Sequence, residues 1–260
     1  STAGNVITVA TAEWAPGIWA GAINMPLEIR SAAGALRGYA NVTSVDMNNF
    51  LVGVDLLPAG TVATDVIWHK GAYNNEFAGI HKILTNTGVL FNIDAAQYDL
   101  FKGNTVTIAP TGPLSFAIIQ DAIARGVEKG LDSDVCVFVN PRSWADLLTE
   151  QAALRMYDQS YRTSESENGS QEITFHGQNG KVEIVPSIYV KQGYAYVLAM
   201  EDFMRVGSTD ITFRRPGQGD DFFRELENNA GYELRAYTDQ CVFCMAPGRS
   251  TLVASITNSN

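Results

Sequence analysis

The sequence predicts an α+β fold, in which helices and strands are mixed around one or two cores. Three regions support this prediction. Residues 113–155 follow the order helix, strand, helix, and residues 172–186 have the pattern of a β-hairpin. Apolar residues alternate at 232–236 and at 241–243, which indicates long strands. Apolar residues make up 46% of the 260-residue chain and charged residues 18%, which is the balance of a globular protein. A chain of this length holds one large or two small domains and can bury a substantial core.

The first region, residues 1–76, gives the weakest signals. The stretch "PLEIRSAAGALRGYA" starts at Pro26 and predicts a helix, since Pro suits a first helical turn, although two internal glycines weaken it. "VATDVIW", over Val62–Trp68, alternates loosely and predicts a strand. An extended arm with loops, without a core of its own, fits this region equally well.

The signals become sharper from Thr111 onward. "TGPLSFAIIQDAIARGVEKG" predicts a helix that starts near Pro113 and ends at Gly130. "DVCVFVN" follows as an apolar run that indicates a strand buried on both faces. Asn140 then suits an N-cap and Pro141 a first helical position, so a second helix is expected directly after the strand.

The remaining residues predict mostly strands. After a polar surface loop at 157–171, "EITFHGQNGKVEIVP" predicts a hairpin that turns at Asn179-Gly180. "YAYVLAM", "FMRVG" and "STDITFR" follow as strands. Alternation on both sides of residues 229–231 indicates long strands that are broken at that point.

Cys241 and Cys244 form a C-x-x-C, a spacing that elsewhere marks a zinc or redox site. In a strand these two residues point to opposite faces, and no Gly or Pro lies between them to make the turn that such a site needs. Cys136 stands alone in another apolar stretch. We therefore expect small buried side chains, and three cysteines without framework spacing indicate a reducing compartment.

Nothing in the sequence has the spacing of a catalytic site. His69, His81 and His176 are isolated, and there is no G-x-S-x-G and no phosphate-binding loop. We therefore predict a protein that is not an enzyme and has no catalytic residue, bound cofactor or metal site. The net charge of −10 argues against a protein that grips nucleic acid by its phosphates. No run approaches the roughly 20 apolar residues of a membrane helix, and the first residues do not resemble a signal peptide.

Four stretches, taken in order, resemble the major capsid proteins of tailed double-stranded DNA bacteriophages, which have the Hong Kong 97 fold. Together they cover about residues 74–256. They are "NNEFAGIHKILTNTGVLFNIDAAQYDLFKGN", "VCVFVNPRSWADL", "GQNGKVEIVPSIYVKQGYAYVLAMEDFMRVGST" and "DDFFRELENNAGYELRAYTDQCVFCMAPGRSTLVASI".

The resemblance implies a Hong Kong 97-like fold with five parts. These are an N-terminal arm, an extended loop with part of a peripheral domain, an axial domain, further peripheral strands, and a C-terminal strand that returns to the axial domain. The corresponding ranges are 1–25, 26–112, 113–205, 206–240 and 241–260. The long spine helix of the family has one weak candidate here, residues 27–40.

The resemblance also implies a function without an active site. Such subunits assemble into hexamers and pentamers, which close into an icosahedral shell that encloses the genome without sequence-specific binding. Portal, scaffolding and decoration proteins are the implied partners. Assembly in the host cytoplasm, residence in the virion and no contact with a membrane follow from the same resemblance. The residues expected at contacts between subunits are Asp158, Arg162, Glu165, Arg214, Arg215, Asp220, Asp221 and Arg224.

Some members of the family join subunits by a Lys–Asn isopeptide bond. The acceptor position falls on Glu225 here, so we expect no such bond, and Lys70 and Lys82 are interpreted as ordinary charged side chains. Two alternatives stay open. One is an encapsulin-type nanocompartment shell that holds a cargo enzyme, and the other is an unrelated hydrolase that uses Asp220 or Asp221.

Overall fold

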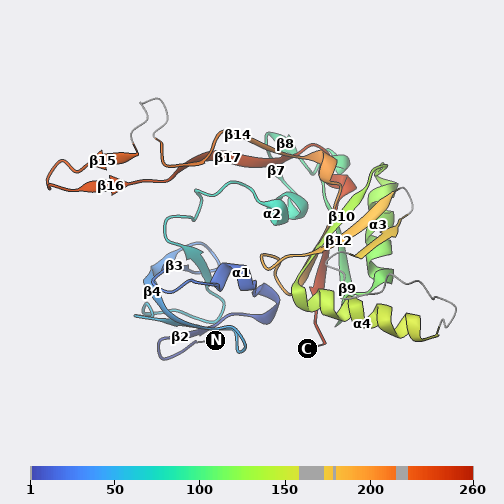
Figure 1. Ribbon diagram of the computed structural model, residues 1–260, viewed down its shortest axis with the longest axis horizontal. Helices are drawn as coiled ribbons and strands as arrows, with labels where there is room; N and C mark the ends of the chain where they lie inside the picture. The colour runs from blue at the N-terminus through green and yellow to red at the C-terminus, as the bar shows by residue number, and fades with distance from the viewer. Residues whose placement is uncertain (1, 158–172, 178–179, 215–221, 260) are drawn as a thin grey trace.

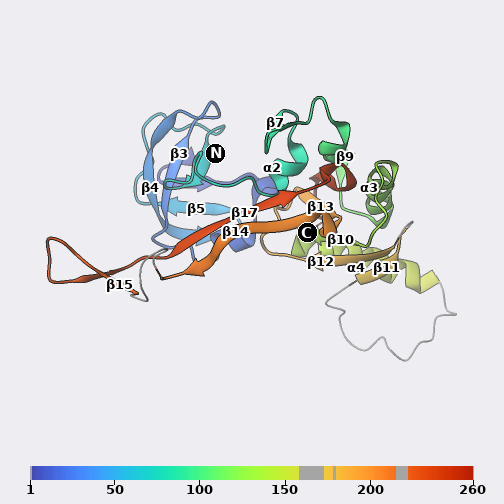
Figure 2. The ribbon, with the colours of Figure 1, turned by 90° about the horizontal axis from the view of Figure 1, so that it is seen from above.

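The computed structural model describes residues 2–157, 173–177, 180–214 and 222–259. Two six-stranded sheets lie side by side, and a long two-stranded ribbon runs from the second sheet past the first (Figures 1 and 2). We call the first the N-terminal sheet and the second, with its helices, the body. Helices and strands are mixed, as the sequence predicts.

The N-terminal sheet is antiparallel throughout and has the strand order β1-β2-β5-β4-β3-β6. Two short helices, η1 (Thr11–Glu13) and α1 (Pro16–Trp19), lead from its second strand to its third. The strands are β1 (Thr2–Ala3), β2 (Val6–Thr8), β3 (Pro26–Arg30), β4 (Leu36–Asp46), β5 (Leu51–Val54) and β6 (Val66–His69).

The helix predicted after Pro26 is wrong, so residues 27–40 are not the spine helix for which they were the candidate. Residues 26–30 form β3 because Leu27 and Ile29 alternate with period two and both side chains are buried. Gly34 has a φ of 90° in the turn to β4, a conformation that suits glycine and would end a helix. The strand predicted at Val62–Trp68 is found in part, as β6.

The N-terminal sheet has a hydrophobic core of its own, so the interpretation of residues 1–76 as an arm with loops is wrong. Trp14 stacks on Trp19 with ring centroids 5.8 Å apart, and Phe50 tilts against Trp14 at 5.3 Å. The buried residues of this core are Ile7, Trp14, Trp19, Ala22, Leu27, Ile29, Ala40, Val42, Val52 and Val54.

The body is built on a mixed sheet with the strand order β11-β12-β10-β13-β18-β9. Two pairs, β10 with β12 and β18 with β9, are parallel, and the other neighbours are antiparallel. The strands are β9 (Asn104–Gly112), β10 (Val135–Val139), β11 (Ile173–His176), β12 (Lys181–Pro186), β13 (Tyr194–Leu198) and β18 (Thr251–Ile256).

Helices cover both faces of this sheet. α3 (Phe116–Glu128) and α4 (Pro141–Tyr157) pack on one face, where Ile119, Ile123 and Leu147 join the main core. α2 (Ile80–Thr85) covers the other face, where Leu84 meets Phe138. The predicted order of helix, buried strand and helix is therefore confirmed, although α3 starts at Phe116 rather than near Pro113.

The predicted hairpin is also confirmed as β11 and β12, which pair from Ile173 opposite Ile184 to His176 opposite Lys181. Its turn residue Asn179 lies outside the described residues, as do residues 158–171 of the predicted polar loop.

The ribbon lies between β13 and β18 in the chain and forms the long projection of the molecule (Figure 1). Its main strands are β14 (Phe203–Thr212) and β17 (Tyr237–Cys244), which are antiparallel. β15 (Phe223–Glu225) and β16 (Tyr232–Leu234) form the tip. The chain turns between them over residues 226–231, which include the break between strands that was predicted at 229–231. Residues 2–69, where part of an extended loop is expected, are compact instead.

Short elements complete the connections. η3 (Met200–Asp202) and η4 (Pro247–Arg249) join the body to the ribbon, and β7 (Val89–Leu90), β8 (Ile93–Asp94) and η2 (Asp99–Phe101) lead from α2 to β9.

Candidate interaction surface

The base of the ribbon is fixed to the body by backbone and charged contacts. The Met245 amide donates to the Asp202 carbonyl at 2.9 Å where the two strands leave the body. The Arg249 guanidinium lies 3.5–3.7 Å from carboxylate oxygens of Asp132, Glu201 and Asp202. Burial raises the pKa of Asp202, and the attraction of Arg249 opposes that rise.

One face of the ribbon is apolar at the end nearest the body. Met204 pairs with Phe243 and Val206 with Cys241 across the two strands, so these four side chains share a face. Phe91 covers Phe243, with the ring centroids 5.1 Å apart. Met204 and Val206 are both exposed. The ribbon therefore carries an apolar stripe that leads outward from the body.

The tip of the ribbon is apolar as well. Phe223 pairs with Leu234, and its ring centroid lies 6.3 Å from that of Tyr232. These side chains are 64%, 51% and 71% exposed, respectively. A hairpin of two strands is only marginally stable in water by itself, and this one has no third strand among the described residues. Its apolar face therefore fits a surface that another molecule covers.

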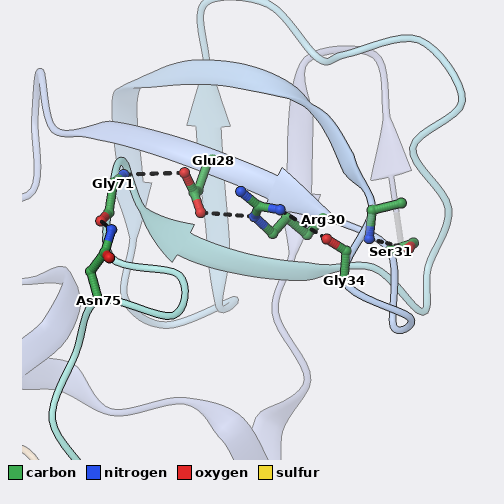
Figure 3. Close-up of polar contacts among 7 residues, drawn as sticks. Glu28, Arg30, Ser31, Gly34, Gly71 and Asn75 are labelled. Atoms are coloured by element: carbon green, nitrogen blue, oxygen red, sulfur yellow. Dashed lines mark hydrogen bonds and ion pairs between the residues drawn. The ribbon is translucent and has the colours of Figure 1, made fainter.

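A charged cluster on β3 holds the segment that leaves the N-terminal sheet (Figure 3). The buried Glu28 carboxylate accepts hydrogen bonds from Arg30 Nε at 2.9 Å and from the Gly71 amide at 3.1 Å. Arg30 Nη1 donates to the Gly34 carbonyl at 2.8 Å, and Asn75 Nδ2 donates to the Gly71 carbonyl at 2.8 Å. The Arg30 hydrogen bond and the Gly71 amide hold the pKa of Glu28 below its usual value.

A second polar cluster joins the N-terminal sheet to the body. Glu13 of η1 accepts hydrogen bonds from Lys191 Nζ and, at 2.8 Å, from the Tyr194 hydroxyl. Burial acts to raise the pKa of Glu13, but these two hydrogen bonds and the charges of Lys191 and His81 together outweigh it, and the net pKa lies below the usual value. Burial, with the bond to Glu13, raises the pKa of Tyr194 to about 12. The Gly193 amide adds a backbone bond of 2.9 Å to the Ala12 carbonyl.

Six of the eight residues predicted at subunit contacts lie outside the described residues: Asp158, Arg162, Glu165, Arg215, Asp220 and Asp221. The other two belong to the ribbon. Arg214 follows β14, with its guanidinium 5.3 Å from the ring centroid of Phe222, and Arg224 lies in β15 opposite Glu233. The structure thus brings Arg214 and Arg224 to the tip region. The Lys70 ammonium lies 5.0 Å from the Tyr39 ring.

Cys241 and Cys244 lie in one strand at positions that point to opposite faces, as the sequence predicts. Cys241 and Cys244 lie in β17 and are free thiols, with Cys244 fully buried and Cys241 half-buried. Burial raises the pKa of Cys244 to about 12. Within the described part of the chain, no three His, Cys, Asp or Glu side chains gather as a metal site.

No helix in the described ranges has the length and apolar character needed to cross a membrane.

The sequence did not predict the residues at the centre of these two polar clusters, which are Glu28, Glu13 and Lys191. The one available signal was a carboxylate between Leu27 and Ile29 in an alternating pattern, which places Glu28 on the face opposite two buried residues. Glu13 and Lys191 are far apart in the chain, and no local pattern connects them.

No known family model and no curated protein sequence matches this chain. Among solved structures, it is similar to the capsid asymmetric unit of cyanophage A-1(L), with a TM-score of 0.44 and 10% identity over 67% of this chain and 57% of that one. It is also similar to a virus-like particle from Pyrococcus furiosus, with a TM-score of 0.37 and 12% identity over 67% of this chain and 58% of that one. The alignments thus span little more than half the length of each of these chains.

Proposed function

We propose that this protein is a structural subunit that assembles with copies of itself into a closed shell. The observation that carries the proposal is the ribbon, which projects from the body and exposes large apolar side chains from its base to its tip (Figure 1). Contiguous exposed apolar surface of this kind marks sites of protein association.

The sequence resemblance gives the proposal its finer form. By that resemblance the shell is an icosahedral phage head, made of hexamers and pentamers around double-stranded DNA. Residues 113–205 and the returning strand, which is β18 within the expected range 241–260, would form its axial domain. The ribbon strands, to which residues 241–244 belong, would form its peripheral domain. Portal, scaffolding and decoration proteins would be its partners in the virion.

The charge of the chain suits a container for DNA. At a net charge of −10, a shell of such chains would as a whole repel phosphates rather than bind them, so enclosed DNA would stay free to move. The same charge makes copies repel one another, which the apolar contacts of the ribbon must overcome.

The test is the native mass of the purified chain, measured by light scattering over a range of concentrations and followed by electron microscopy. We expect closed particles, or discrete species of five or six subunits. A monomer of 28.2 kDa at every concentration, with or without a scaffolding protein, would contradict the proposal.

The contents of such particles distinguish a phage head from a nanocompartment. Enclosed nucleic acid in particles isolated from the producing cell, detected by the ratio of absorbance at two ultraviolet wavelengths, supports a phage head. Enclosed protein without nucleic acid supports the alternative, a nanocompartment around a cargo enzyme.

A further inference from the structure

The N-terminal sheet contains a cavity of about 580 Å³ that is only partly closed. Ile29 and Ile67 lie opposite each other on β3 and β6 and form one wall, so the cavity is on the inner face of the sheet. Its apolar lining includes residues of three strands, of the segment after β2 and of helix α1: Ile7, Val9, Trp19, Leu27, Ile29 and Ile67.

The cavity is open to solvent on one side, so its apolar walls are left in contact with water. Apolar surface that faces water rather than other side chains forfeits the contacts and the burial that an apolar occupant would give. The lining also includes polar side chains, among them Glu13, Asp65 and Lys191, so water can occupy the polar side of the cavity while the apolar walls stay poorly solvated. An apolar occupant would therefore stabilise the sheet.

The cavity lies beside an open edge of the sheet. β6 is the last strand in the order, so its outer edge has no partner strand within the described ranges. Val66, Ile67 and His69 of this strand all line the cavity. An unpaired edge next to an apolar groove is the arrangement that accepts an added strand, with side chains of alternate residues in the groove.

The tip of the ribbon has the matching properties. Each of its strands, β15 and β16, has one edge without a partner in the described part of the chain. Tyr232 and Leu234 are two residues apart in β16 and so share a face, which Phe223 extends across the hairpin. The tip therefore offers what the cavity lacks: a strand edge and three large apolar side chains.

We propose that the ribbon tip of one copy docks in the N-terminal sheet of a second copy, against the edge of β6 and with its apolar face in the cavity. The inference rests on the proposed function, because it requires association of identical chains. The tip does not fill the cavity of its own chain, since it extends past the N-terminal sheet along the long axis of the molecule in both views (Figures 1 and 2).

The contact is of the head-to-tail kind, in which one surface of a copy meets a different surface of the next. Contacts of this kind produce rings when the rotation closes. The same contact can therefore be repeated around a closed assembly without any free tip or empty cavity.

Cross-linking between two variants tests this contact. In a background with Cys136→Ser and Cys241→Ser, one variant carries Asn229→Cys at the turn of the tip and the other His69→Cys at the rim of the cavity. Both positions are exposed. The two are mixed before assembly and treated with a short bis-maleimide, so a link between residues 229 and 69 joins two different copies. Val89→Cys, equally accessible on β7, replaces His69→Cys in the matched control.

We expect a species of twice the 28.2 kDa chain mass, with the 229–69 link identified by mass spectrometry and at least tenfold more abundant than the 229–89 link. Light scattering on the same samples separates the outcomes. Particles that form without the 229–69 link would overturn the docking and leave the proposed function standing, and the neighbour would then contribute another surface. Monomers in every sample would overturn both.

A pair of substitutions gives a second measurement without cross-linking. Leu234→Ser removes an exposed apolar side chain from the tip, and Leu100→Ser removes one of similar exposure from η2. We expect Leu234→Ser alone to raise the concentration needed for half-assembly by about tenfold, with the Tm of the unassembled chain unchanged. Equal effects of the two variants would contradict a specific contact at the tip.

Discussion

Glu28 shows at the scale of one residue how a buried charge is kept in the N-terminal sheet. Its carboxylate lies between Arg30 and the Gly71 amide, so the charged form is both paired and hydrogen-bonded. Because these contacts lower its pKa in the folded chain, they stabilise the fold at pH values above the unfolded pKa, and that contribution is lost as the pH falls through the folded pKa.

We therefore predict that Glu28→Gln lowers the Tm at pH 7 by a few degrees and that the difference from the wild type shrinks below pH 4.5, the usual value for Glu. Thermal unfolding followed by circular dichroism from pH 7 to pH 3 measures both effects. Glu227→Gln, at an exposed position in the tip turn, serves as the control and should leave the Tm unchanged. A difference that grows at acid pH would show that another group controls the response.

The cysteines give a second prediction at this scale. Cys244 is buried and its pKa is raised to about 12, so almost none of it is thiolate at pH 8. We expect the native unassembled chain to leave Cys244 unmodified by a maleimide while Cys241 reacts, and all three cysteines to react after unfolding. Peptide mapping identifies the sites, and labelling of Cys244 at the rate of Cys241 would contradict the described burial.

The helix caps can be tested at the scale of elements. Asn140 starts α4: its side-chain oxygen accepts from the Arg142 amide at 3.0 Å, and its amide donates to the Val190 carbonyl at 2.8 Å in a fully buried site. We predict that Asn140→Ala costs about 2–3 kcal/mol in the free energy of unfolding. Ser115→Ala, which removes a longer cap bond of 3.4 Å from α3, should cost no more than about 1 kcal/mol. Urea unfolding gives both values, and a reversed order would contradict them.

The junction between the N-terminal sheet and the body is a second element-scale feature. A Cβ on Gly193 would lie 2.6 Å from the Ala12 Cβ and 2.9 Å from its carbonyl oxygen, so no side chain fits without moving η1. We predict that Gly193→Ala loosens the sheet from the body and speeds limited proteolysis between them. Gly88→Ala, where a Cβ would meet nothing within 4 Å, is the matched control and should be cleaved like the wild type.

Sequence patterns predicted the body well because its signals are local. Asn140 with Pro141 marked a helix start, and Asn179-Gly180 marked a hairpin. They failed at Pro26 because the alternation of Leu27 and Ile29 covers only one short strand, and a Pro at a helix start gave a competing local signal. The cavity and the Glu13–Lys191 contact were out of reach, since both depend on segments that only the tertiary fold brings together.

At the scale of the whole molecule, charge and apolar surface act against each other. Copies with a net charge of −10 repel, and salt screens that repulsion, since the Debye length falls from about 10 Å at 0.1 M to about 3 Å at 1 M. If apolar contacts at the ribbon drive association, higher NaCl should promote assembly. Light scattering across this range measures it. Dissociation at high salt would show instead that ion pairs between subunits, as first expected around Arg214 and Arg224, dominate.

The position of β18 has a consequence for how the molecule is made. This strand lies between β13 and β9 in the sheet, yet it follows the whole ribbon in the chain. On the ribosome, the N-terminal sheet can therefore fold as soon as β6 has emerged, and the ribbon is synthesised while the body still lacks an inner strand. Parallel pairing of β18 with β9 must wait for residues 251–256. Completion of the body is thus tied to the synthesis of residues 251–256, and a nascent chain that has made only the ribbon has no finished body from which to build a shell.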